Sequence, residues 1–304
     1  MQIGYIGAGA MGAPMIARLV QAQPNNVAVF DSDPNVTARV AQGTGARACT
    51  SIAEIAADCD VLLSCVPDNT TVRNVYLGDG GVASAIKAGT ITIDCSTVGP
   101  DVTREVYAGL KAQGASHLDA SMLGSIKQAN EGTISFAVGG DKDAFERAKP
   151  VLAVCGQMIR HCGPSGAGNH MKLIHQTLVA GHAVAVAEAM GLCLETGADI
   201  ETFFDIVTQG TGFAYSRYFE NRVPRMRQGD FSALFMLKFL LKDIRLAREM
   251  TANENFPALD ANIRAFEDCV EEGWGGDDFS AVMKLVETRI GKPVSKSASG
   301  IDFN

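Results

Sequence analysis

A glycine pattern of the GxGxxG type stands near the N-terminus and reads Gly7-Ala8-Gly9-Ala10-Met11-Gly12. It directly follows the apolar run Ile3–Ile6, which has the pattern of a strand, and it opens a helical pattern. Glycines at this spacing permit a tight turn and let the backbone approach a pyrophosphate, which then meets the positive end of the helix. Because the strand–turn–helix context is present, the pattern predicts a dinucleotide site.

Asp31 ends the second predicted strand, about 20 residues after the glycine pattern. A carboxylate at this place accepts hydrogen bonds from ribose hydroxyls and repels a 2′-phosphate, and Asp33 adds a second negative charge close by. No Arg or Lys stands at or beside Ser32, and Arg39 is the one basic residue that could reach back. The sequence therefore predicts NAD rather than NADP as the cofactor.

The third predicted strand ends at Cys65-Val66-Pro67-Asp68-Asn69. Ligands of open α/β sheets bind outside the carboxyl ends of the strands, so Val66 and Pro67 are candidate cofactor contacts. Pro67 has an equally good explanation as a residue that simply ends the strand.

Lys172 lies near the start of a long apolar helical pattern that begins at about Asn169. Lys172, His175, Gln176 and Val179 fall at helical spacing on one face. A hydride transfer needs a group that takes the alcohol proton or gives it back, and a lysine in an apolar setting can do this. The alternative is a structural lysine whose ammonium reaches solvent. Spacing alone leaves both interpretations open.

The elements that would position these residues follow a βαβ rhythm as far as about residue 165. This alternation predicts a parallel sheet with helices on both faces, and after Gly163-Pro164-Ser165-Gly166 the patterns are helical almost throughout. We predict an α/β fold with a Rossmann-type NAD-binding domain over residues 1–165 and an all-helical substrate and dimerisation domain over residues 166–304. Strands are expected at Ile3–Ile6, Val27–Phe30, Val61–Cys65, Thr90–Asp94 and Ile134–Val138.

Composition excludes several other classes of function. The 304-residue chain carries a net charge of -8 and no basic run, which disfavours a nucleic-acid partner. None of the eight cysteines forms a CxxC pair, and no His/Asp/Glu cluster has metal-ligand spacing, so we predict no metal. Neither Ser96 nor Ser121 lies in a GxSxG elbow, which disfavours a serine hydrolase.

Compartment and assembly are predicted from the apolar segments. The N-terminus lacks the basic and long apolar regions of a signal peptide, and the longest apolar stretch, Leu178–Leu194, contains His182 and Glu188. That stretch predicts a buried core helix rather than a membrane span. We expect a cytoplasmic protein with reduced thiols and no membrane partner. Because the helix is too apolar for one chain to cover, we also expect a homodimer or homotetramer.

The motifs together resemble the β-hydroxyacid dehydrogenases, and the resemblance runs from Ile3 to about Val294. That family includes 3-hydroxyisobutyrate, tartronate semialdehyde, glyoxylate/succinate semialdehyde and threonate-type enzymes, and more distantly 6-phosphogluconate dehydrogenase. Four motifs and one late signature carry the resemblance. The first motif is the glycine pattern with Ala13-Pro14-Met15, and the second is Asp94-Cys95-Ser96-Thr97. The third runs from Asp119-Ala120 through Gly124 to Ala129, Gly132-Thr133 and Gly139-Gly140; the fourth is Gly168 with Lys172, and the late signature is Lys242-Asp243.

The resemblance implies roles for several residues. Lys172 becomes the catalytic acid/base, Thr97 a neighbour of the nicotinamide, and Lys242 a residue that closes over the cofactor. For Lys242 the alternative is plain surface charge, in a basic stripe with Lys238 and Arg245. The implied substrate contacts are Ser96 and backbone N–H groups of the loop Leu123, Gly124 and Ser125. The side chains of His175 and Gln176 would hydrogen-bond the substrate or orient Lys172.

Two departures from the family pattern bear on the substrate. The family loop usually reads Ser-Gly-Gly where this chain has Leu123-Gly124-Ser125, and the usual Asn-Asn pair is His175-Gln176. The histidine and the stretch Phe219–Arg222 look like the threonate-type enzymes, which favours a polyhydroxylated or otherwise unusual acid.

The resemblance implies NAD-dependent oxidation of a small β-hydroxy acid to the semialdehyde or keto acid, as in 3-hydroxyisobutyrate dehydrogenase; a β-keto acid product could then lose CO₂. The alternative is a reductase of a small semialdehyde such as tartronate or succinate semialdehyde, against which Asp31 argues because reductive enzymes often take NADPH. A non-catalytic NAD-binding scaffold and an imine reductase on the same fold are further alternatives. Both are disfavoured by Lys172, because such relatives lose that lysine or carry Asp or Tyr there.

Overall fold

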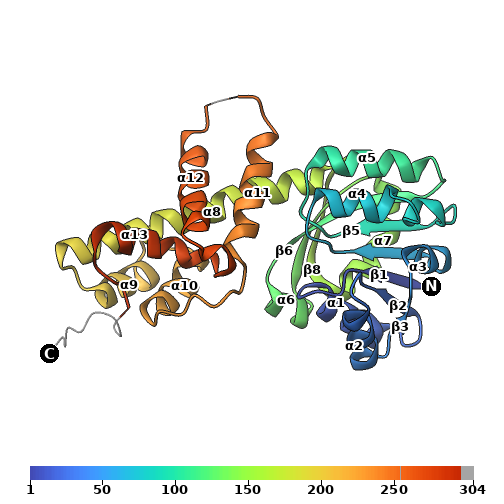
Figure 1. Cartoon of the computed structure of the whole chain (residues 1–304), viewed down its shortest axis with the longest axis horizontal. Helices are drawn as coiled ribbons and strands as arrows, with labels where there is room; N and C mark the ends of the chain where they lie inside the picture. The colour runs from blue at the N-terminus through green and yellow to red at the C-terminus, as the bar shows by residue number, and fades with distance from the viewer. Residues whose placement is uncertain (254, 296–304) are drawn as a thin grey trace. The chain divides into compact units, whose positions relative to one another are not determined.

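The structure is a computed structural model that describes residues 1–253 and 255–295. The chain forms two compact units, one over Met1–Leu173 and the other from Ile174 onward (Figure 1). The boundary predicted near residue 165 precedes this division, because the first turns of the long helix α8 (Ala167–Thr196) belong to the first unit.

The first unit is built on one eight-stranded sheet with strand order β3-β2-β1-β4-β5-β6-β7-β8. The neighbouring strands pair in parallel except β6 and β7, which are antiparallel. The sheet is therefore mostly parallel, as the βαβ rhythm predicts, and this pair is the exception. The connection, residues 124–133, is shorter than the dozen or so residues that a crossover needs. The strands are β1 (Ile3–Ile6), β2 (Val27–Phe30), β3 (Arg47–Ala48), β4 (Val61–Ser64), β5 (Ile91–Asp94), β6 (Ser116–Leu123), β7 (Ile134–Gly139) and β8 (Gly156–Gly163).

Helices cover both faces of this sheet (Figure 1). Ile3 and Tyr5 of β1 join a core cluster with Met15 of α1, whereas Ile6 joins a second cluster with Val72 of α4. All four residues of β1, β4 and β5 are buried, as expected of central strands covered on two sides. The helices of this unit are α1 (Gly12–Ala22), α2 (Pro34–Thr44), α3 (Ile52–Asp58), α4 (Asn69–Leu77), α5 (Pro100–Lys111), α6 (Ile126–Glu131) and α7 (Lys142–Cys155).

In its described residues the second unit consists of helices joined by loops, with one isolated antiparallel bridge between Met236 and Asp278. Its core contains Leu240 and Ile244 of α11, Phe266 of α12 and Met283 of α13. The helices, besides the rest of α8, are α9 (Ile200–Gln209), α10 (Arg217–Arg227), α11 (Leu237–Glu249), α12 (Pro257–Glu271) and α13 (Val282–Ile290).

Asp278 ties this helical unit together. Its buried carboxylate accepts a hydrogen bond from Arg222 Nε of α10 at 2.9 Å and backbone N–H groups of Leu234 and Phe235 at 3.1 Å each. Arg222 also lies over the ring of Phe279. Arg222, which the sequence associated with threonate-type enzymes, thus has a structural partner within the helical unit.

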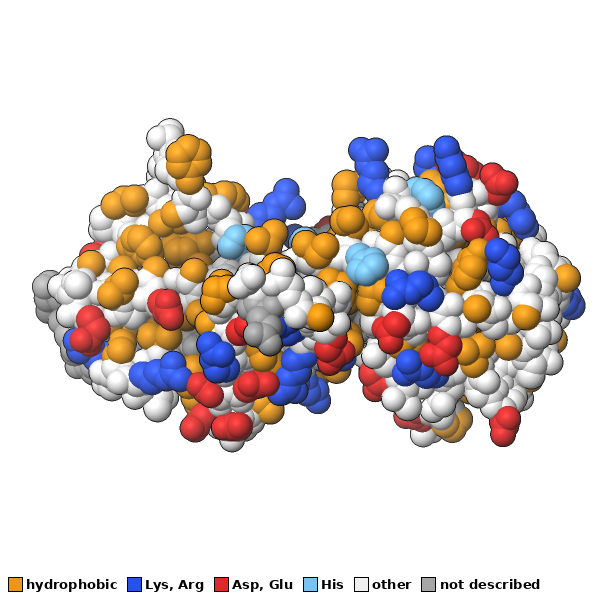
Figure 2. All heavy atoms as spheres, turned by 90° about the horizontal axis from the view of Figure 1, so that it is seen from above, with side chains coloured by type: hydrophobic (Ala, Val, Ile, Leu, Met, Phe, Trp, Pro, Cys, Tyr) orange, Lys and Arg blue, Asp and Glu red, His pale blue; other side chains and the backbone are white. Residues whose placement is uncertain are grey.

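Helix α8 is less covered by its own chain than a core helix should be. Within the described residues it alone is long and apolar enough to cross a membrane, a test that core helices of soluble proteins also pass, and 33% of its most apolar stretch is buried. Leu178 is 61% and Leu192 65% exposed. Figure 2 shows many hydrophobic side chains on the visible face of the helical unit. Within this chain, the expected burial of Leu178–Leu194 is therefore only partial.

Candidate active site

The glycine loop between β1 and α1 is shaped by close backbone contacts. Gly7 has φ +90°, and a Cβ there would overlap the carbonyl group of Cys65. A Cβ at Gly12 would overlap the carbonyl oxygen of Gly7, whereas one at Gly9 would meet nothing within 4 Å. None of the described side chains caps the start of α1 at Met11, which suits an anionic ligand at the positive end of this helix. The predicted loop residues Ala8 and Ala10 lie in the same turn, and these features fit a pyrophosphate.

Asp31 joins the glycine loop to the end of β2. Its Oδ2 accepts a hydrogen bond from the Ala8 N–H at 2.7 Å, and its Oδ1 accepts one from the Asp33 N–H at 3.0 Å. A carboxylate has about four acceptor positions, so Asp31 keeps the capacity to bind ribose hydroxyls. The side chain predicted to select the cofactor therefore also sets the position of the loop.

A buried polar network joins the ends of β4 and β5. Asp94 Oδ1 accepts hydrogen bonds from Ser64 Oγ at 2.8 Å and from Ser96 Oγ at 2.6 Å, and Ser96 Oγ accepts one from the Val66 N–H at 2.9 Å. A serine hydroxyl has one proton and two lone pairs. Ser96 therefore donates its proton to Asp94 and uses one lone pair for the Val66 N–H. A substrate could bind this hydroxyl only by donating a hydrogen bond to the second lone pair of Ser96 Oγ.

Two further cofactor candidates border this network. Thr97 is half-buried between the buried residues Ser96 and Val98. Pro67 lies between β4 and α4, directly before Asp68, whose carboxylate caps α4 by accepting from the Thr71 N–H at 2.8 Å. Val66, Pro67 and Thr97 follow the carboxyl ends of β4 and β5, at the edge of the sheet where a cofactor is expected.

The loop after β6 is organised by a helix cap. Ser125 is the N-cap of α6, and its N–H donates to Gln128 Oε1 at 2.9 Å, as does its hydroxyl at 2.5 Å. A substrate carboxylate would have to compete with Gln128 for the Ser125 N–H. Leu123 is the last residue of β6, and Gly124 lies between Leu123 and Ser125.

Lys172 lies in the first unit, on the second turn of α8. Of the lysines and arginines that the structure describes, it alone is buried, with 9% of its surface exposed. This burial argues against a lysine that extends into solvent. The neutral amine of a lysine is the form that can accept a proton.

A second network lies within the helical unit. Gln176 Nε2 donates to Asp243 Oδ2 at 2.8 Å, and Lys242 Nζ forms an ion pair with Asp243 Oδ1 at 3.1 Å. His175 Nδ1 lies 3.2 Å from Gln176 Oε1. Asp243 thus links Lys242 to Gln176, the neighbour of His175, although the sequence marked Asp243 only as the neighbour of Lys242. The signal that was missed is a carboxylate on the apolar face of α11, beside Leu240 and Ile244.

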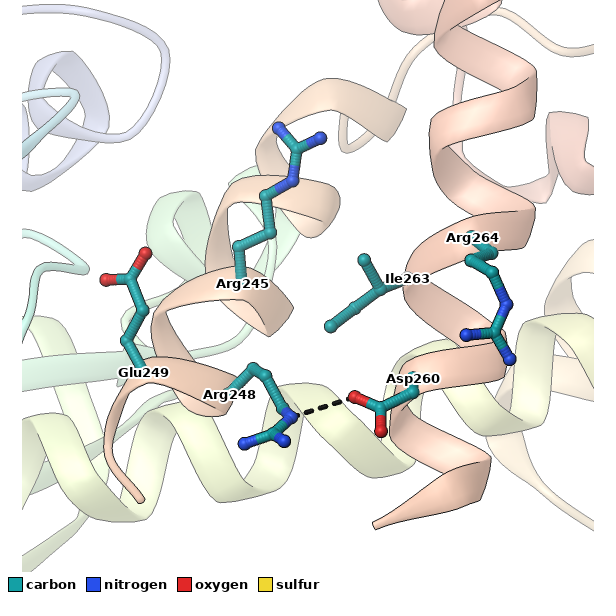
Figure 3. Close-up of a pocket in the computed structure, with 6 residues that line it drawn as sticks. All are labelled: Arg245, Arg248, Glu249, Asp260, Ile263 and Arg264. Atoms are coloured by element: carbon teal, nitrogen blue, oxygen red, sulfur yellow. Dashed lines mark hydrogen bonds and ion pairs between the residues drawn. The ribbon is translucent and has the colours of Figure 1, made fainter. Parts of the chain in front are cut away.

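A separate hollow of about 320 Å³ lies between α11 and α12 (Figure 3). Arg248 in it pairs with Asp260 at 2.8 Å, and Arg245 pairs with Glu267 at 2.6 Å. None of the predicted site residues lines it. Among the described residues, no group of three or more His, Cys, Asp or Glu side chains is arranged to hold a metal ion.

Comparison with known families accounts for both parts of the chain. Residues 2–163 match the NAD binding domain of 6-phosphogluconate dehydrogenase. Residues 166–286 match the domain described as NAD-binding of NADP-dependent 3-hydroxyisobutyrate dehydrogenase. The chain belongs to the β-hydroxyacid dehydrogenase family. The family and the fold class predicted from sequence are thereby confirmed.

Several similar proteins have named activities. The 2-(hydroxymethyl)glutarate dehydrogenase of Eubacterium barkeri is 36% identical over 97% of this chain and 98% of its own length. The L-threonate dehydrogenase of Cupriavidus necator is 34% identical over 93% of this chain and 95% of its own. The structure of Mycobacterium tuberculosis 3-hydroxyisobutyrate dehydrogenase with L-serine has a TM-score of 0.85 and 30% identity, covering 94% of this chain and 99% of that one. This β-hydroxyacid dehydrogenase is accordingly an NAD-binding oxidoreductase that acts on CH–OH groups.

Proposed function

We propose that this enzyme oxidises a small β-hydroxy acid with NAD, and that Lys172 takes the proton of the hydroxyl group. The observation that carries the proposal is the burial of Lys172 at the start of α8. The characterised relatives named above are dehydrogenases of small hydroxy acids, which supports the substrate class.

The residues of the glycine loop and Asp31 would hold the cofactor, which supplies a hydride acceptor when bound. The space above Gly9 and the uncapped start of α1 suit the pyrophosphate, and Asp31 suits the ribose. We propose NAD rather than NADP because Asp31 and Asp33 would repel a 2′-phosphate.

Lys172 would act as general base during oxidation. Its neutral amine accepts the hydroxyl proton as the hydride leaves the carbinol carbon, and a carbonyl group forms. In the reverse direction the Lys172 ammonium returns this proton to the carbonyl oxygen. Ser96 would accept a hydrogen bond from the substrate, since its own proton is held by Asp94. Gln176 and His175 would orient the substrate.

The substrate would carry more polar groups than 3-hydroxyisobutyrate itself. Leu123 stands where the family usually has serine, so one hydroxyl donor to the carboxylate is lost. His175 would restore a polar contact near Lys172. Among the relatives, the named substrates with an additional carboxylate or hydroxyls, 2-(hydroxymethyl)glutarate and threonate, fit this change. Reduction of a small semialdehyde, such as tartronate or succinate semialdehyde, is the second candidate.

The test measures NADH formation over a panel of acids: 3-hydroxyisobutyrate, 3-hydroxypropionate, glycerate, threonate and 2-(hydroxymethyl)glutarate, each with NAD and with NADP. Lys172→Ala should lose most of kcat while binding NADH normally. Lys149→Ala, at an exposed lysine of α7, serves as the control and should match the wild type. Unchanged turnover in Lys172→Ala removes this residue from the mechanism. NADH oxidation with tartronate or succinate semialdehyde, together with no NADH formation from any of the acids, selects the reductase.

Assembly and location belong to the same proposal. We propose two functional domains, residues 1–165 for the cofactor and 166–304 for substrate and dimerisation, in a cytoplasmic homodimer or homotetramer without nucleic-acid or membrane partners. The exposed apolar residues Leu178 and Leu192 of α8 support burial against a second copy. A cytoplasmic location is supported by the lack of any CxxC pair among the eight cysteines. Light scattering after size exclusion should give a dimer or tetramer, and a monomer would reject this arrangement.

A further inference from the structure

Asp119 lies near the middle of β6 and contacts the start of α8. Its side chain is buried, and each carboxylate oxygen accepts a hydrogen bond from the backbone at the start of α8. Oδ1 accepts from the Gly166 N–H at 2.8 Å, and Oδ2 accepts from the Asn169 N–H at 2.9 Å. The first N–H groups of a helix have no partner within the helix, so Asp119 caps α8 from a neighbouring strand.

Two glycines make room for this contact. A Cβ at Gly139 of β7 would lie 2.5 Å from Asp119 Oδ1, and a Cβ at Gly168 of α8 would lie 2.8 Å from Asp119 Oδ2. A side chain at either glycine would therefore force the Asp119 carboxylate or helix α8 to move. The close approach of β6, β7 and α8 at this point therefore depends on three residues together.

Asn169 extends the contact to the segment after β5. Its side-chain amide donates to the Val98 carbonyl oxygen at 3.1 Å, and its Oδ1 accepts from Thr103 Oγ1 at 3.4 Å. Val98 directly follows Thr97, a predicted cofactor contact. The residue that Asp119 holds by its backbone thus also links α8 to the cofactor side of the sheet.

Lys172 lies three residues after Asn169, about one helical turn further along α8. We propose that Asp119 is a positioning residue for Lys172: by holding the Gly166 and Asn169 N–H groups, it fixes the first turn of α8 and with it the distance of Lys172 from the reacting hydroxyl. The proposal rests on the proposed role of Lys172 as the general base. A displacement of about 1 Å in a reacting group can cost about a hundredfold in rate, so a restraint of this kind bears on kcat.

Asp119→Asn tests this inference with little change of shape. The amide keeps one acceptor but turns an N–H donor toward one of the two backbone N–H groups, so one hydrogen bond is lost. We expect kcat to fall by about tenfold to a hundredfold, while KM for the acid and the Kd of NADH change by less than about threefold. Asp199→Asn is the matched control, because Asp199 caps α9 through the Thr202 N–H and should leave kcat unchanged.

A double-mutant cycle with Lys172→Ala separates positioning from general loosening of the fold. If Asp119 acts through Lys172, the double variant should be no slower than Lys172→Ala alone. Additive losses would overturn the proposal and leave the role of Lys172 intact. If Lys172→Ala itself keeps wild-type turnover, the proposed function fails at its lysine, a different and recognisable result.

Asp119→Ser covers the case in which Asp119→Asn does not fold. A serine hydroxyl can accept one of the two N–H groups without placing an amide against the other, and it is too short to hold both. The same loss of kcat with unchanged NADH affinity, again absent on the Lys172→Ala background, is expected. Wild-type kcat in either folded variant would overturn the proposal.

Discussion

The stability of this enzyme should depend on pH through Asp119, and the structure gives the direction. Burial raises the pKa of this carboxyl from 3.8 to about 6, against the lowering effect of the Gly166 and Asn169 N–H donors, and the nearby Asp94 carboxylate adds to the rise. Between about pH 4 and pH 6 the folded protein therefore holds a proton that the unfolded chain has released. A state that binds more protons loses stability as pH rises, so this contribution is present below about pH 4 and lost above about pH 6.

The size of the effect follows from the same shift. A change from 3.8 to about 6 is about two pKa units, and one unit corresponds to about 1.4 kcal/mol. The contribution of Asp119 to the free energy of unfolding should therefore fall by about 2 to 3 kcal/mol as the pH rises from about 4 to about 7. Asp119→Asn cannot ionise, so the variant should lack this dependence.

The assay is urea unfolding of wild type and Asp119→Asn at several pH values, with the difference between their unfolding free energies plotted against pH. The difference isolates Asp119, because a group such as His117, whose burial lowers its pKa to about 3, titrates in both proteins. We expect the difference to fall by the amount above. A constant difference would mean that the N–H donors balance the effect of burial, and one that rises with pH would mean that they outweigh it. Either result would refute the reasoning.

Three further predictions concern the cofactor site and the helical unit. Gly9→Ala should weaken NADH binding by about tenfold or more without changing the melting temperature, since its Cβ would meet no described atom within 4 Å but would occupy the approach of the pyrophosphate. Gly12→Ala should lower both the NADH affinity and the melting temperature. Fluorescence titration measures the affinity and calorimetry the melting temperature. Asp31→Ser should raise the ratio of kcat/KM with NADP to that with NAD by about tenfold or more, and an unchanged ratio would exclude Asp31 as the selector. Asp278→Ala should destabilise the protein by about 3 to 5 kcal/mol in urea unfolding, because Arg222 loses its buried partner.

Local patterns in the sequence were enough to predict much of this protein. The glycine loop, Asp31 and the boundaries of β1 and β2 follow from residue type and short spacing, since a strand alternates every two residues and a helix repeats every 3.6. The helical second half and the position of Lys172 on α8 follow in the same way. The family comparison confirms the class of fold and enzyme that these motifs indicated.

Only the tertiary structure decided which polar side chains work together. Asp119 meets Gly166 across 47 residues of sequence, and Gln176 meets Asp243 across 67, and no periodic pattern relates positions so far apart. The antiparallel pairing of β6 with β7 also depends on how the chain packs after a short connection. The burial of Lys172 belongs to this second group, because a lysine's exposure is set by the elements that fold over it, whereas its place on a helix is set by its neighbours in the chain.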